Sequence, residues 1–355
     1  MKKLTSISLF SGAGGLDVGF ENAGFETLFA NEFDHDAAEA WRINRPTKAT
    51  VMIEGDIKDH IKELSKFANV DVLFGGPPCQ GFSVAGKMDP NDERSKMVWM
   101  FMDAVKKSRP KTFVMENVAA LGILEKWKKI RDEIVAQGNK LGYNVSFRVH
   151  HTSDYGVPEN RDRVIFIGIR KDIGKSDLFY KELEKFIVAP KSAREAILSA
   201  GLYGSKENPQ TCTAKVSLAN HPIMRKSAYA GMLVNGAGRP INLDGIAPTL
   251  PASMGGNKTP IVDEIALHDK NIPNWFETYH KKLKNGKTTP LKTKIPSTIR
   301  RLTIKECAAI QTFPLEYKFS GQKTKQYKQI GNAVPCHFAE AIAQSLRNAF
   351  KEKFK

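Results

Sequence analysis

The first 170 residues alternate short apolar runs with amphipathic stretches, and this alternation constrains the fold most. Helical stretches such as 34–42 and 97–107 separate runs with strand character, which are 7–10, 25–30, 70–74, 112–115, 143–150 and 164–169. Strands separated by helices form βαβ units, which predicts an α/β fold with a mostly parallel sheet covered by helices on both faces. A short loop joins the last two runs, so we expect one antiparallel edge.

The regular pattern decays after about residue 186. Residues 200–298 are rich in Gly, Pro, Asn and Ser and have poor periodicity, whereas 337–350 has the pattern of an amphipathic helix. We therefore expect a first domain over 1–185 and a smaller irregular domain over 186–298. A junction segment over 299–324 and a C-terminal segment over 325–355 would follow, the latter packing back on the first domain.

Charge and cysteine content narrow the class of protein. The formal net charge is +16 with a pI near 9.5, which suits a polyanionic partner, although a basic protein without such a partner remains an alternative. None of the four cysteines lies in a CxxC pair, so we expect neither a metal nor a disulfide framework. No segment approaches the roughly 20 apolar residues of a membrane span, so we expect a cytoplasmic protein without membrane contact.

A cysteine stands on a tight turn directly after a strand. Residues 75–83 read Gly-Gly-Pro-Pro-Cys-Gln-Gly-Phe-Ser and follow the apolar run 70–74. Open α/β sheets bind ligands at the carboxyl ends of their strands, which is where this turn would lie. Cys79 is therefore a candidate nucleophile, since a thiolate is intrinsically reactive and a positive neighbourhood increases its fraction.

A glycine-rich turn follows the first strand. It reads Phe-Ser-Gly-Ala-Gly-Gly-Leu over 10–16, and such a turn lets a ligand approach backbone N–H groups. It does not match GxGxxG because Asp17 occupies the last glycine position. Glu32 and Asp56 follow the next two strands, where Glu32 could accept from ribose hydroxyls and Phe33 could lie against an adenine. A strand-end cap for Glu32 and a helix N-cap for Asp56 are the structural alternatives.

Two further segments carry charged residues at the predicted sheet edge. Met115-Glu116-Asn117-Val118 closes one strand, and Arg161 and Arg163 precede the strand 164–169. Alternate residues of an extended chain point to one side, so the two arginines would face the same way. The alternatives are an ordinary strand-end carboxylate and two surface arginines.

Taken together, these motifs resemble those of the cytosine-C5 DNA methyltransferases. The Pro-Pro-Cys-Gln turn and the Gly-Asn-Ala-Val-Pro string of 331–335 are the most specific, and the blocks cover roughly 5–170 and 299–345 in the family's order. The resemblance implies a Rossmann-like methyltransferase sheet in which Cys79 adds to cytosine C6. Glu116 would donate a hydrogen bond at N3, which requires a pKa raised by burial.

The resemblance also implies roles for the arginines. In the family's Gln-x-Arg-x-Arg motif the second arginine, here Arg163, contacts the cytosine O2, and Arg161 is the first. Glu159 stands where the family has glutamine, so the role of that position stays open. No base for the C5 proton is assigned, because a water chain or a group of the turn 80–83 could serve, and Ser83 could instead hold a phosphate.

The cofactor implied is S-adenosylmethionine, which leaves as S-adenosylhomocysteine, and no metal is implied. Carried over by position, the residues that would line its site lie in the glycine-rich turn, at the ends of the next strands, beside the cysteine and in the 331–335 string. They are Phe10, Gly12, Gly14, Gly15, Leu16, Glu32, Phe33, Asp56, Ile57, Pro78, Asn332 and Val334.

The irregular segment 186–298 lies where the family has its target-recognition domain. The loop 253–259 could read base edges in the major groove, or it could be a plain surface loop. Residues 281–301 carry eight Lys or Arg and no acid, which fits a solvated linker or a strip facing phosphates. The candidate DNA-binding residues are Ser83, Arg94, Thr249, Leu250, Gly255, Gly256, Asn257 and Lys258.

We therefore expect methylation of cytosine C5 in a specific double-stranded DNA sequence, with the target base flipped into the site. The context would be that of a monomeric, nucleoid-associated bacterial enzyme paired with a restriction endonuclease. Alternatives are methylation of transfer RNA, a DNA-binding protein that has lost catalysis, and a nicotinamide oxidoreductase. Thr303 and Glu306 additionally predict a helix capping box in the C-terminal region.

Overall fold

A computed structural model describes residues 3–78 and 96–354 of the chain. The chain divides into two compact units, which we describe separately. Unit 1 comprises Met1–Gly156, Arg161–Ala189 and Ala333–Lys355, and unit 2 comprises Val157–Asn160 and Pro190–Asn332. Among the described residues, no helix has the length and apolar character that crossing a membrane requires.

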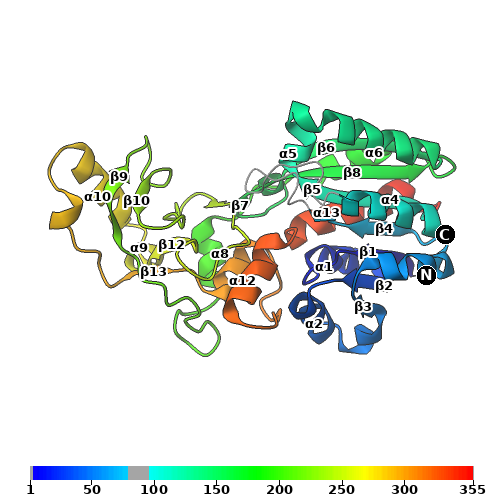
Figure 1. The fold of residues 1–355 in the computed structure, drawn as a ribbon. Coiled ribbons are helices and arrows are strands. Elements are labelled where there is room, and N and C mark those ends of the chain that lie inside the picture. The colour runs from blue at the N-terminus through cyan, green and yellow to red at the C-terminus, as the bar shows by residue number, and fades with distance from the viewer. Residues whose placement is uncertain (1–2, 79–95, 355) are drawn as a thin grey trace. The chain divides into compact units, whose positions relative to one another are not determined.

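Unit 1 contains a seven-stranded sheet (Figure 1) in the order β3-β2-β1-β4-β5-β8-β6. All neighbouring pairs are parallel except those of β8, which runs antiparallel to both β5 and β6. The predicted mostly parallel sheet is confirmed, as is the antiparallel pairing of the last two runs. The strands are β1 (Leu4–Leu9), β2 (Phe25–Glu32), β3 (Met52–Glu54), β4 (Val72–Gly75), β5 (Thr112–Val118), β6 (Tyr143–His151) and β8 (Asp162–Arg170).

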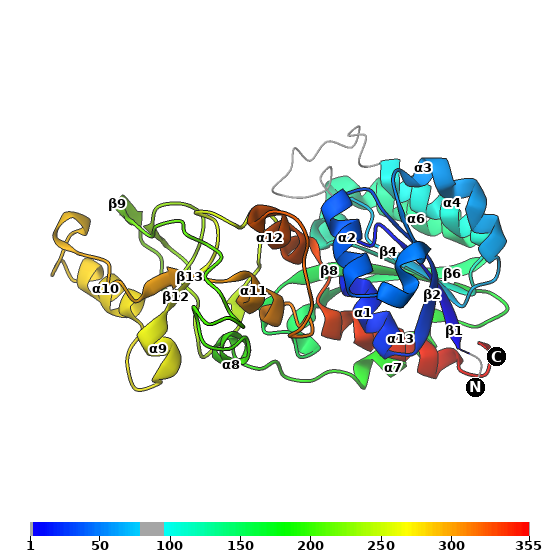
Figure 2. The ribbon, with the colours of Figure 1, turned by 90° about the horizontal axis from the view of Figure 1, so that it is seen from below.

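Helices cover both faces of this sheet (Figure 2), with α1, α7 and α13 on one face and α3, α4 and α6 on the other. Helix α13 packs directly on α1, where a Cβ added to Gly19 would lie 2.3 Å from the backbone nitrogen of Glu340, so only glycine permits this approach. The helices of unit 1 are α1 (Gly15–Asn22), α2 (His35–Ile43), α3 (Ile57–His60), α4 (Met97–Ser108), α5 (Ala119–Ile123), α6 (Lys128–Lys140), α7 (Ser176–Glu184) and α13 (Cys336–Phe350).

The parallel strands of unit 1 all end at one edge of the sheet, so the loops that follow them gather there. Strand β5 is longer than the sequence predicted, because β8 pairs with it to its end, with Glu116 opposite Ile165. Glu116 therefore lies within the last residues of β5, as the segment 115–118 that closes the predicted strand indicated. Its backbone is paired with β8, whereas the pairing of β5 with β4 ends one residue earlier, at Met115.

Unit 2 is built from short elements. Its strands are β7 (Glu159–Asn160), β9 (Leu218–Ile223), β10 (Met232–Val234), β11 (Ala247–Pro248), β12 (Ile261–Asp263) and β13 (Ile299–Arg301). Its helices are α8 (Ala193–Ser199), α9 (Glu264–His268), α10 (Trp275–Lys284), α11 (Ile304–Ile310) and α12 (Lys323–Asn332), and η6 (Pro290–Lys292) is a 3-10 turn. The predicted capping box is confirmed, since Thr303 and Glu306 cap α11 reciprocally.

Two arginines of the predicted basic strip are buried in unit 2. Arg300 Nη2 lies 2.8 Å from Glu306 Oε1, and its Nε lies 2.5 Å from Glu264 Oε2. Arg301 donates to the carbonyl oxygens of Ala214 at 3.0 Å and Thr259 at 2.7 Å. Neither reading of the 281–301 strip therefore applies to Arg300 and Arg301, whose guanidinium groups are used inside the unit.

Candidate active site

Glu116 and Arg163, two of the predicted site residues of unit 1, form an ion pair. Arg163, on the neighbouring strand β8, places its Nε 2.6 Å from Glu116 Oε1. Arg163 pairs with Val118 across the ladder, two residues beyond Glu116, so the contact is a diagonal cross-strand pair. Both side chains are largely buried, which keeps the ion pair in one geometry.

Burial raises the pKa of the Glu116 carboxyl above its ordinary value, because desolvation disfavours the charged form. The positive charges of Arg163 and Arg161 act in the opposite direction but do not outweigh burial. A raised pKa is the direction that proton donation at a pyrimidine N3 requires. The site can therefore present a carboxylic acid with its orientation already set by an arginine.

The turn that leads to the cysteine runs directly beside this carboxyl. A Cβ added to Gly76 would lie 2.7 Å from Glu116 Oε2, and Asn117 Nδ2 donates to the Pro77 carbonyl at 3.1 Å. Pro78 is half-buried and is the last residue described before the gap, so Cys79 lies outside the described residues. The sequence reasoning gave Asn117 no role; its place beside Glu116 in the Glu-Asn-Val motif was the available signal.

The two arginines of the motif have different surroundings. Arg161 is 2% exposed, and its Nη2 donates to the carbonyl of Ala333 at 2.9 Å, so it contacts the Gly-Asn-Ala-Val-Pro string rather than Glu116 directly. Val334 is buried in unit 1, whereas Asn332 is the last residue of α12 in unit 2. Within unit 1, the hydrogen bond from Arg161 to Ala333 thus connects the arginine motif to the 331–335 string.

The glycine-rich turn is held to the end of β2. Phe10, Gly12 and Gly14 all have positive φ, at 52°, 55° and 93°, which makes the turn after β1 sharp. Glu32 Oε2 accepts the N–H of Gly12 at 2.8 Å, and its Oε1 accepts those of Phe33 and Asp34 at 2.9 and 2.8 Å. Burial raises the pKa of Glu32, and these hydrogen bonds oppose the rise. The strand-end cap named as an alternative is therefore present.

Other predicted cofactor residues divide into exposed and buried ones. Phe33 is 75% exposed, whereas Leu16 and Ile57 are buried and Gly15 adds no side chain. Asp56 is the N-cap of α3 and accepts the N–H of Lys58 at 3.0 Å, as the structural alternative predicted. Asn31, which the sequence reasoning missed, donates to the carbonyls of Ile53 and Gly55, both at 3.0 Å, and joins the ends of β2 and β3.

These residues fit a nucleoside-bearing cofactor. No atom of residues 3–78 or 96–354 lies within 4 Å of a Cβ built on Gly12, so these residues leave the turn open to a ligand on that side. A largely exposed aromatic ring follows the carboxyl of Glu32 at the same sheet edge, and the capped end of α3 follows β3. An open turn, a carboxylate and an exposed ring are the groups that a ribose and a purine need.

Of the predicted DNA-binding residues, Thr249 and Leu250 contact Glu159 and Asn160 of unit 2, which precede the two arginines in the chain. Strands β7 and β11 pair in parallel, Thr249 Oγ1 donates to the Asn160 carbonyl, and Leu250 N–H donates to Glu159 Oε1 at 2.5 Å. Glu159 and Leu250 are both fully buried. Glu159 thus binds the backbone of the Thr-Leu pair, and the Leu250 side chain belongs to the interior.

The loop 253–259 is a tight turn with an exposed tip. Thr259 is buried and its Oγ1 accepts the N–H of Gly255 at 2.9 Å, whereas Asn257 and Lys258 are exposed. Gly255 has φ 103°, and Gly256 has open space beside it. Ser83 and Arg94 lie outside the described residues.

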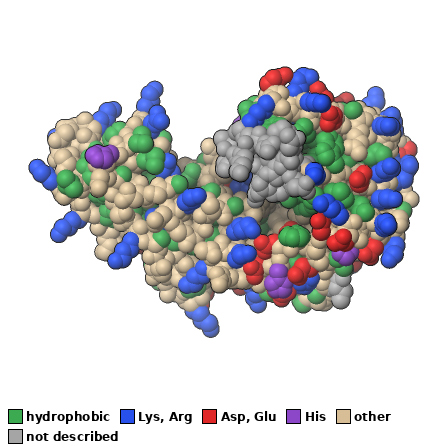
Figure 3. All heavy atoms as spheres, in the orientation of Figure 1, with side chains coloured by type: hydrophobic (Ala, Val, Ile, Leu, Met, Phe, Trp, Pro, Cys, Tyr) green, Lys and Arg blue, Asp and Glu red, His purple; other side chains and the backbone are tan. Residues whose placement is uncertain are grey.

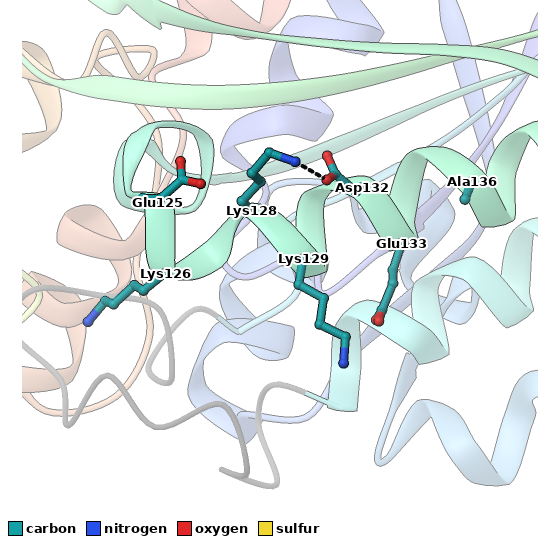
Figure 4. Close-up of a pocket in the computed structure, with 7 residues that line it drawn as sticks. All are labelled: Glu125, Lys126, Lys128, Lys129, Asp132, Glu133 and Ala136. Atoms are coloured by element: carbon teal, nitrogen blue, oxygen red, sulfur yellow. Dashed lines mark hydrogen bonds and ion pairs between the residues drawn. The ribbon is translucent and has the colours of Figure 1, made fainter.

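A separate surface depression lies over η4 (Glu125–Trp127) and α6 (Figure 4). Charged side chains line it, and Lys128 Nζ pairs with Asp132 Oδ2 at 2.7 Å. None of the described residues that line it is a predicted site residue, so we assign it no role in the reaction. Across residues 3–78 and 96–354 no group of three His, Cys, Asp or Glu side chains is arranged to hold a metal ion.

Comparison with known proteins identifies a family. The family model described as C-5 cytosine-specific DNA methylase matches residues 4–348. The Type II methyltransferase M1.HphI of Haemophilus parahaemolyticus is 33% identical, covering 97% of this chain and 86% of that protein. The Type II methyltransferase M.FnuDI of Fusobacterium nucleatum is 31% identical, covering 98% and 96%.

Solved structures share the fold. A chain from E. coli, described as a DNA modification methyltransferase encoded within a prophage, has a TM-score of 0.65 at 22% identity, covering 98% of this chain and 99% of that one. The Dnmt2 methyltransferase of S. pombe has a TM-score of 0.63 at 14% identity, covering 99% of both chains. At these identities the likeness supports the fold alone.

Proposed function

The chain belongs to the C-5 cytosine-specific DNA methylase family, and on that premise we propose how its own residues methylate DNA. Family and relatives make it a DNA cytosine-5 methyltransferase of the kind found in Type II restriction–modification systems. The observation that carries the proposal is the buried Glu116–Arg163 pair beside Gly76, three residues before Cys79. This arrangement sets an oriented acid next to the turn that bears the nucleophile.

In the proposed reaction the Cys79 thiolate forms a bond to C6 of a cytosine that has left the helix. Glu116 donates its proton at N3, so the electron pair of the C5–C6 double bond becomes available at C5. C5 then takes up a methyl group. A base removes the C5 proton, the C6–S bond breaks to regenerate the thiolate, and N3 returns its proton to Glu116. Arg163 orients Glu116 and also donates to the cytosine O2.

S-adenosylmethionine is the proposed methyl donor, and it supplies an electrophilic methyl group and leaves as S-adenosylhomocysteine. The glycine-rich turn would hold it through backbone groups around Gly12 and Gly14. Glu32 would accept from the ribose at Oε2, which accepts one N–H and has a second lone pair, whereas Oε1 already accepts two. Phe33 would stack on the adenine, which explains why its ring is left exposed.

The proposed substrate is a specific double-stranded DNA sequence, and the proposed biological partner is a restriction endonuclease that cleaves the same sequence. Support comes from the relatives, which are Type II methyltransferases that match nearly the whole chain. We propose a monomer acting on DNA in the bacterial cytoplasm. Thr249 and the exposed tip of the 253–259 loop would contact the DNA from unit 2.

A covalent trap tests the nucleophile. Bisulfite sequencing of a plasmid from cells that express the protein first identifies the methylated site. A duplex with 5-fluorocytosine at that site is then incubated with protein and S-adenosylmethionine. Fluorine at C5 cannot leave as a proton does, so the C6–S bond persists. We expect a stable adduct, mapped by peptide mass spectrometry to Cys79.

Two variants control this experiment. Cys79→Ala should bind the duplex without forming an adduct. Cys212→Ala changes a buried cysteine of unit 2 and should still form it. An adduct at another residue, or methyl transfer at full rate in Cys79→Ala, would refute the assignment.

A further inference from the structure

Strand β6 ends in two histidines that stand opposite the arginine motif, and the proposed reaction uses neither of them. The last two pairs of the β6–β8 ladder are His150 with Arg163 and His151 with Asp162. Successive residues of a strand point to opposite faces of the sheet. The two histidines therefore lie on opposite sides of the sheet and have different surroundings.

His150 is buried and uncharged. Residues directly opposite each other in an antiparallel ladder share a face, so His150 lies beside Arg163. Three aromatic rings surround it, with centroids 6.0 Å (Tyr155), 6.4 Å (Tyr180) and 5.6 Å (Phe338) from that of the imidazole. Burial lowers the pKa of His150 to about 4, because desolvation disfavours its charged form. A change with pH near neutrality at this end of β6 must therefore come from another group.

His151 is exposed and paired with a carboxylate. Its Nδ1 lies 2.6 Å from Asp162 Oδ1, and its side chain is 65% exposed. The hydrogen bond and charge of Asp162 raise the pKa of His151 above its ordinary value of 6.5, and the charge of Asp154 adds to the rise. Strand β8 and helices α5, α6 and α7 pack on β6. Of the charged groups described on these elements and on η5 (Thr152–Asp154), Asp162 and Asp154 are the two that act on His151.

Asp162 connects His151 to the Glu116–Arg163 pair through its backbone. The Asp162 carbonyl accepts Arg163 Nη1 at 2.7 Å, while Arg163 Nε lies 2.6 Å from Glu116 Oε1. The guanidinium group thus has two contacts, one with a peptide carbonyl and one with the carboxyl that it orients. His151 and Asp162 are the last pair of the ladder, where a strand end opens most easily. A contact that closes this pair keeps the carbonyl in place for Arg163.

An exposed ion pair by itself is no evidence of a role. On the face drawn in Figure 3, acidic and basic side chains lie close together at several places on unit 1. Such pairs contribute little to stability. The pair of His151 with Asp162 differs in its place, because Asp162 is the residue whose carbonyl holds Arg163. An effect on the rate of reaction, rather than on stability, would distinguish it from an ordinary surface pair.

We propose that His151 is a positioning residue for the Glu116–Arg163 pair and that it acts through Asp162. The protonated imidazole holds the start of β8, so Arg163 keeps Glu116 oriented for the flipped cytosine. When His151 loses its proton, the contact with Asp162 retains a hydrogen bond but no ion pair, and Glu116 is oriented less often. The proposal rests on the proposed function, in which Glu116 is the acid.

The ratio of two rates tests this role, because a ratio cancels the titration of Glu116 and Cys79, which all variants share. His151→Asn keeps a hydrogen-bond donor for Asp162 but has no charge to lose. At pH 6, with DNA and S-adenosylmethionine saturating, the unaltered protein should be about two- to five-fold faster than His151→Asn, the range that an exposed ion pair allows. At pH 9 the two rates should be equal. The KM for each substrate should not change.

Two further variants test the route and the specificity of the effect. If His151 acts through Asp162, the double variant H151N/D162N should be no slower at pH 6 than either single variant. His268→Asn is the matched control, since it removes a histidine–carboxylate contact on α9 of unit 2, from His268 Nε2 to Glu264 Oε1 at 3.1 Å. The control should have the rate of the unaltered protein at both pH values.

Several results would overturn the positioning role while DNA methylation stands. They are equal rates of His151→Asn and the unaltered protein at pH 6, a ratio that stays constant between pH 6 and pH 9, a change in KM alone, losses that add in the double variant, and a control that shows the same ratio. If the unaltered protein transfers no methyl group to DNA, the proposed reaction itself fails, and the positioning role fails with it.

Discussion

Unit 1 and residues 215–236 and 275–295 of unit 2 place their charged side chains in opposite surroundings. Unit 1 buries Glu116 against Arg163 inside the sheet, where the pair has one geometry. Residues 215–236 and 275–295 leave nine basic side chains in solvent, with no ion pair to any described residue. A buried ion pair is costly to desolvate and suits a site that must hold one reacting atom in place. Exposed lysines cost little, because water solvates and screens their charges.

Unit 2 also contains a buried pair, Arg300 with Glu306, but the residues around this pair hold the start of α11. Glu306 completes the cap of α11, and Asn208 and Thr303 share the same network. The contrast between the two buried pairs is therefore testable. A change in the Glu116–Arg163 pair should lower the rate of methyl transfer, and a change in the Arg300–Glu306 pair should lower the stability of unit 2.

The largest expected effect is on the reaction. Glu116→Gln keeps the shape of the side chain, but an amide N–H is too weak an acid to transfer its proton to N3, so the rate of methyl transfer at saturating substrates should fall about 10²- to 10⁴-fold. The assay follows labelled methyl groups into DNA. Glu133→Gln, an exposed change on α6, is the control and should leave the rate unaltered. A Glu116→Gln rate near that of the control would remove Glu116 from the chemistry.

Glu306→Gln should lower the stability of unit 2 and leave the rate of methyl transfer unchanged. It removes one of the two carboxylates that pair with the buried Arg300, which keeps Glu264, so the free energy of unfolding of unit 2 should fall by about 3 kcal/mol at most. Urea unfolding followed by tryptophan fluorescence can measure this, because Trp275 reports on unit 2 while Trp41, Trp99 and Trp127 lie in unit 1. If Glu306→Gln slows methyl transfer without changing the stability of unit 2, the two buried pairs do not differ as we state.

Asp17 is a further buried carboxyl of unit 1, and the cost of its burial can be measured. It is fully buried, its Oδ1 accepts Trp41 Nε1 at 2.9 Å, and burial raises its pKa to about 6. The unfolded carboxyl ionises near 3.8, so the folded state is penalised as pH rises from 3.8 to 6, and fully above 6. The penalty there is about 3 kcal/mol.

Asp17→Asn keeps the acceptor for Trp41 and removes this penalty. The variant should therefore be more stable than the unaltered protein at pH 8, by an amount that shrinks at pH 5. Denaturant unfolding at the two pH values measures the difference. An equal gain at both, or a loss at pH 8, would show that the ionised carboxylate is not disfavoured.

The smallest effect concerns the cap of α11. Thr303→Ala removes the hydroxyl that accepts the Glu306 N–H at 3.1 Å, so unit 2 should lose about 1 kcal/mol, less than Glu306→Gln loses. The same Trp275 signal applies. Thr303→Ser, which keeps the hydroxyl, should restore most of the stability, and failure of that rescue would mean that the methyl group matters more than the cap.

Local patterns in the sequence predicted the regular parts of the molecule well. The starts of β2, β5 and α4 and the capping box at Thr303 and Glu306 all follow from neighbouring residues. Unit 2 was harder to predict, because its elements are short and it is held by long-range contacts such as those of Arg301. The eight basic residues of 281–301 illustrate the limit, since composition could not separate the buried Arg300 and Arg301 from the exposed lysines.

The sequence by itself determined the class of sheet, the glycine-rich and cysteine-bearing turns after their strands, and the family. These properties depend on residues within a few positions of one another, where periodicity and turn chemistry act. Only the tertiary structure decided that β8 lies between β5 and β6, that Arg163 pairs with Glu116, and that Arg161 holds Ala333. Those contacts join residues far apart in the chain, and strand order and register, which no local pattern contains, bring them together.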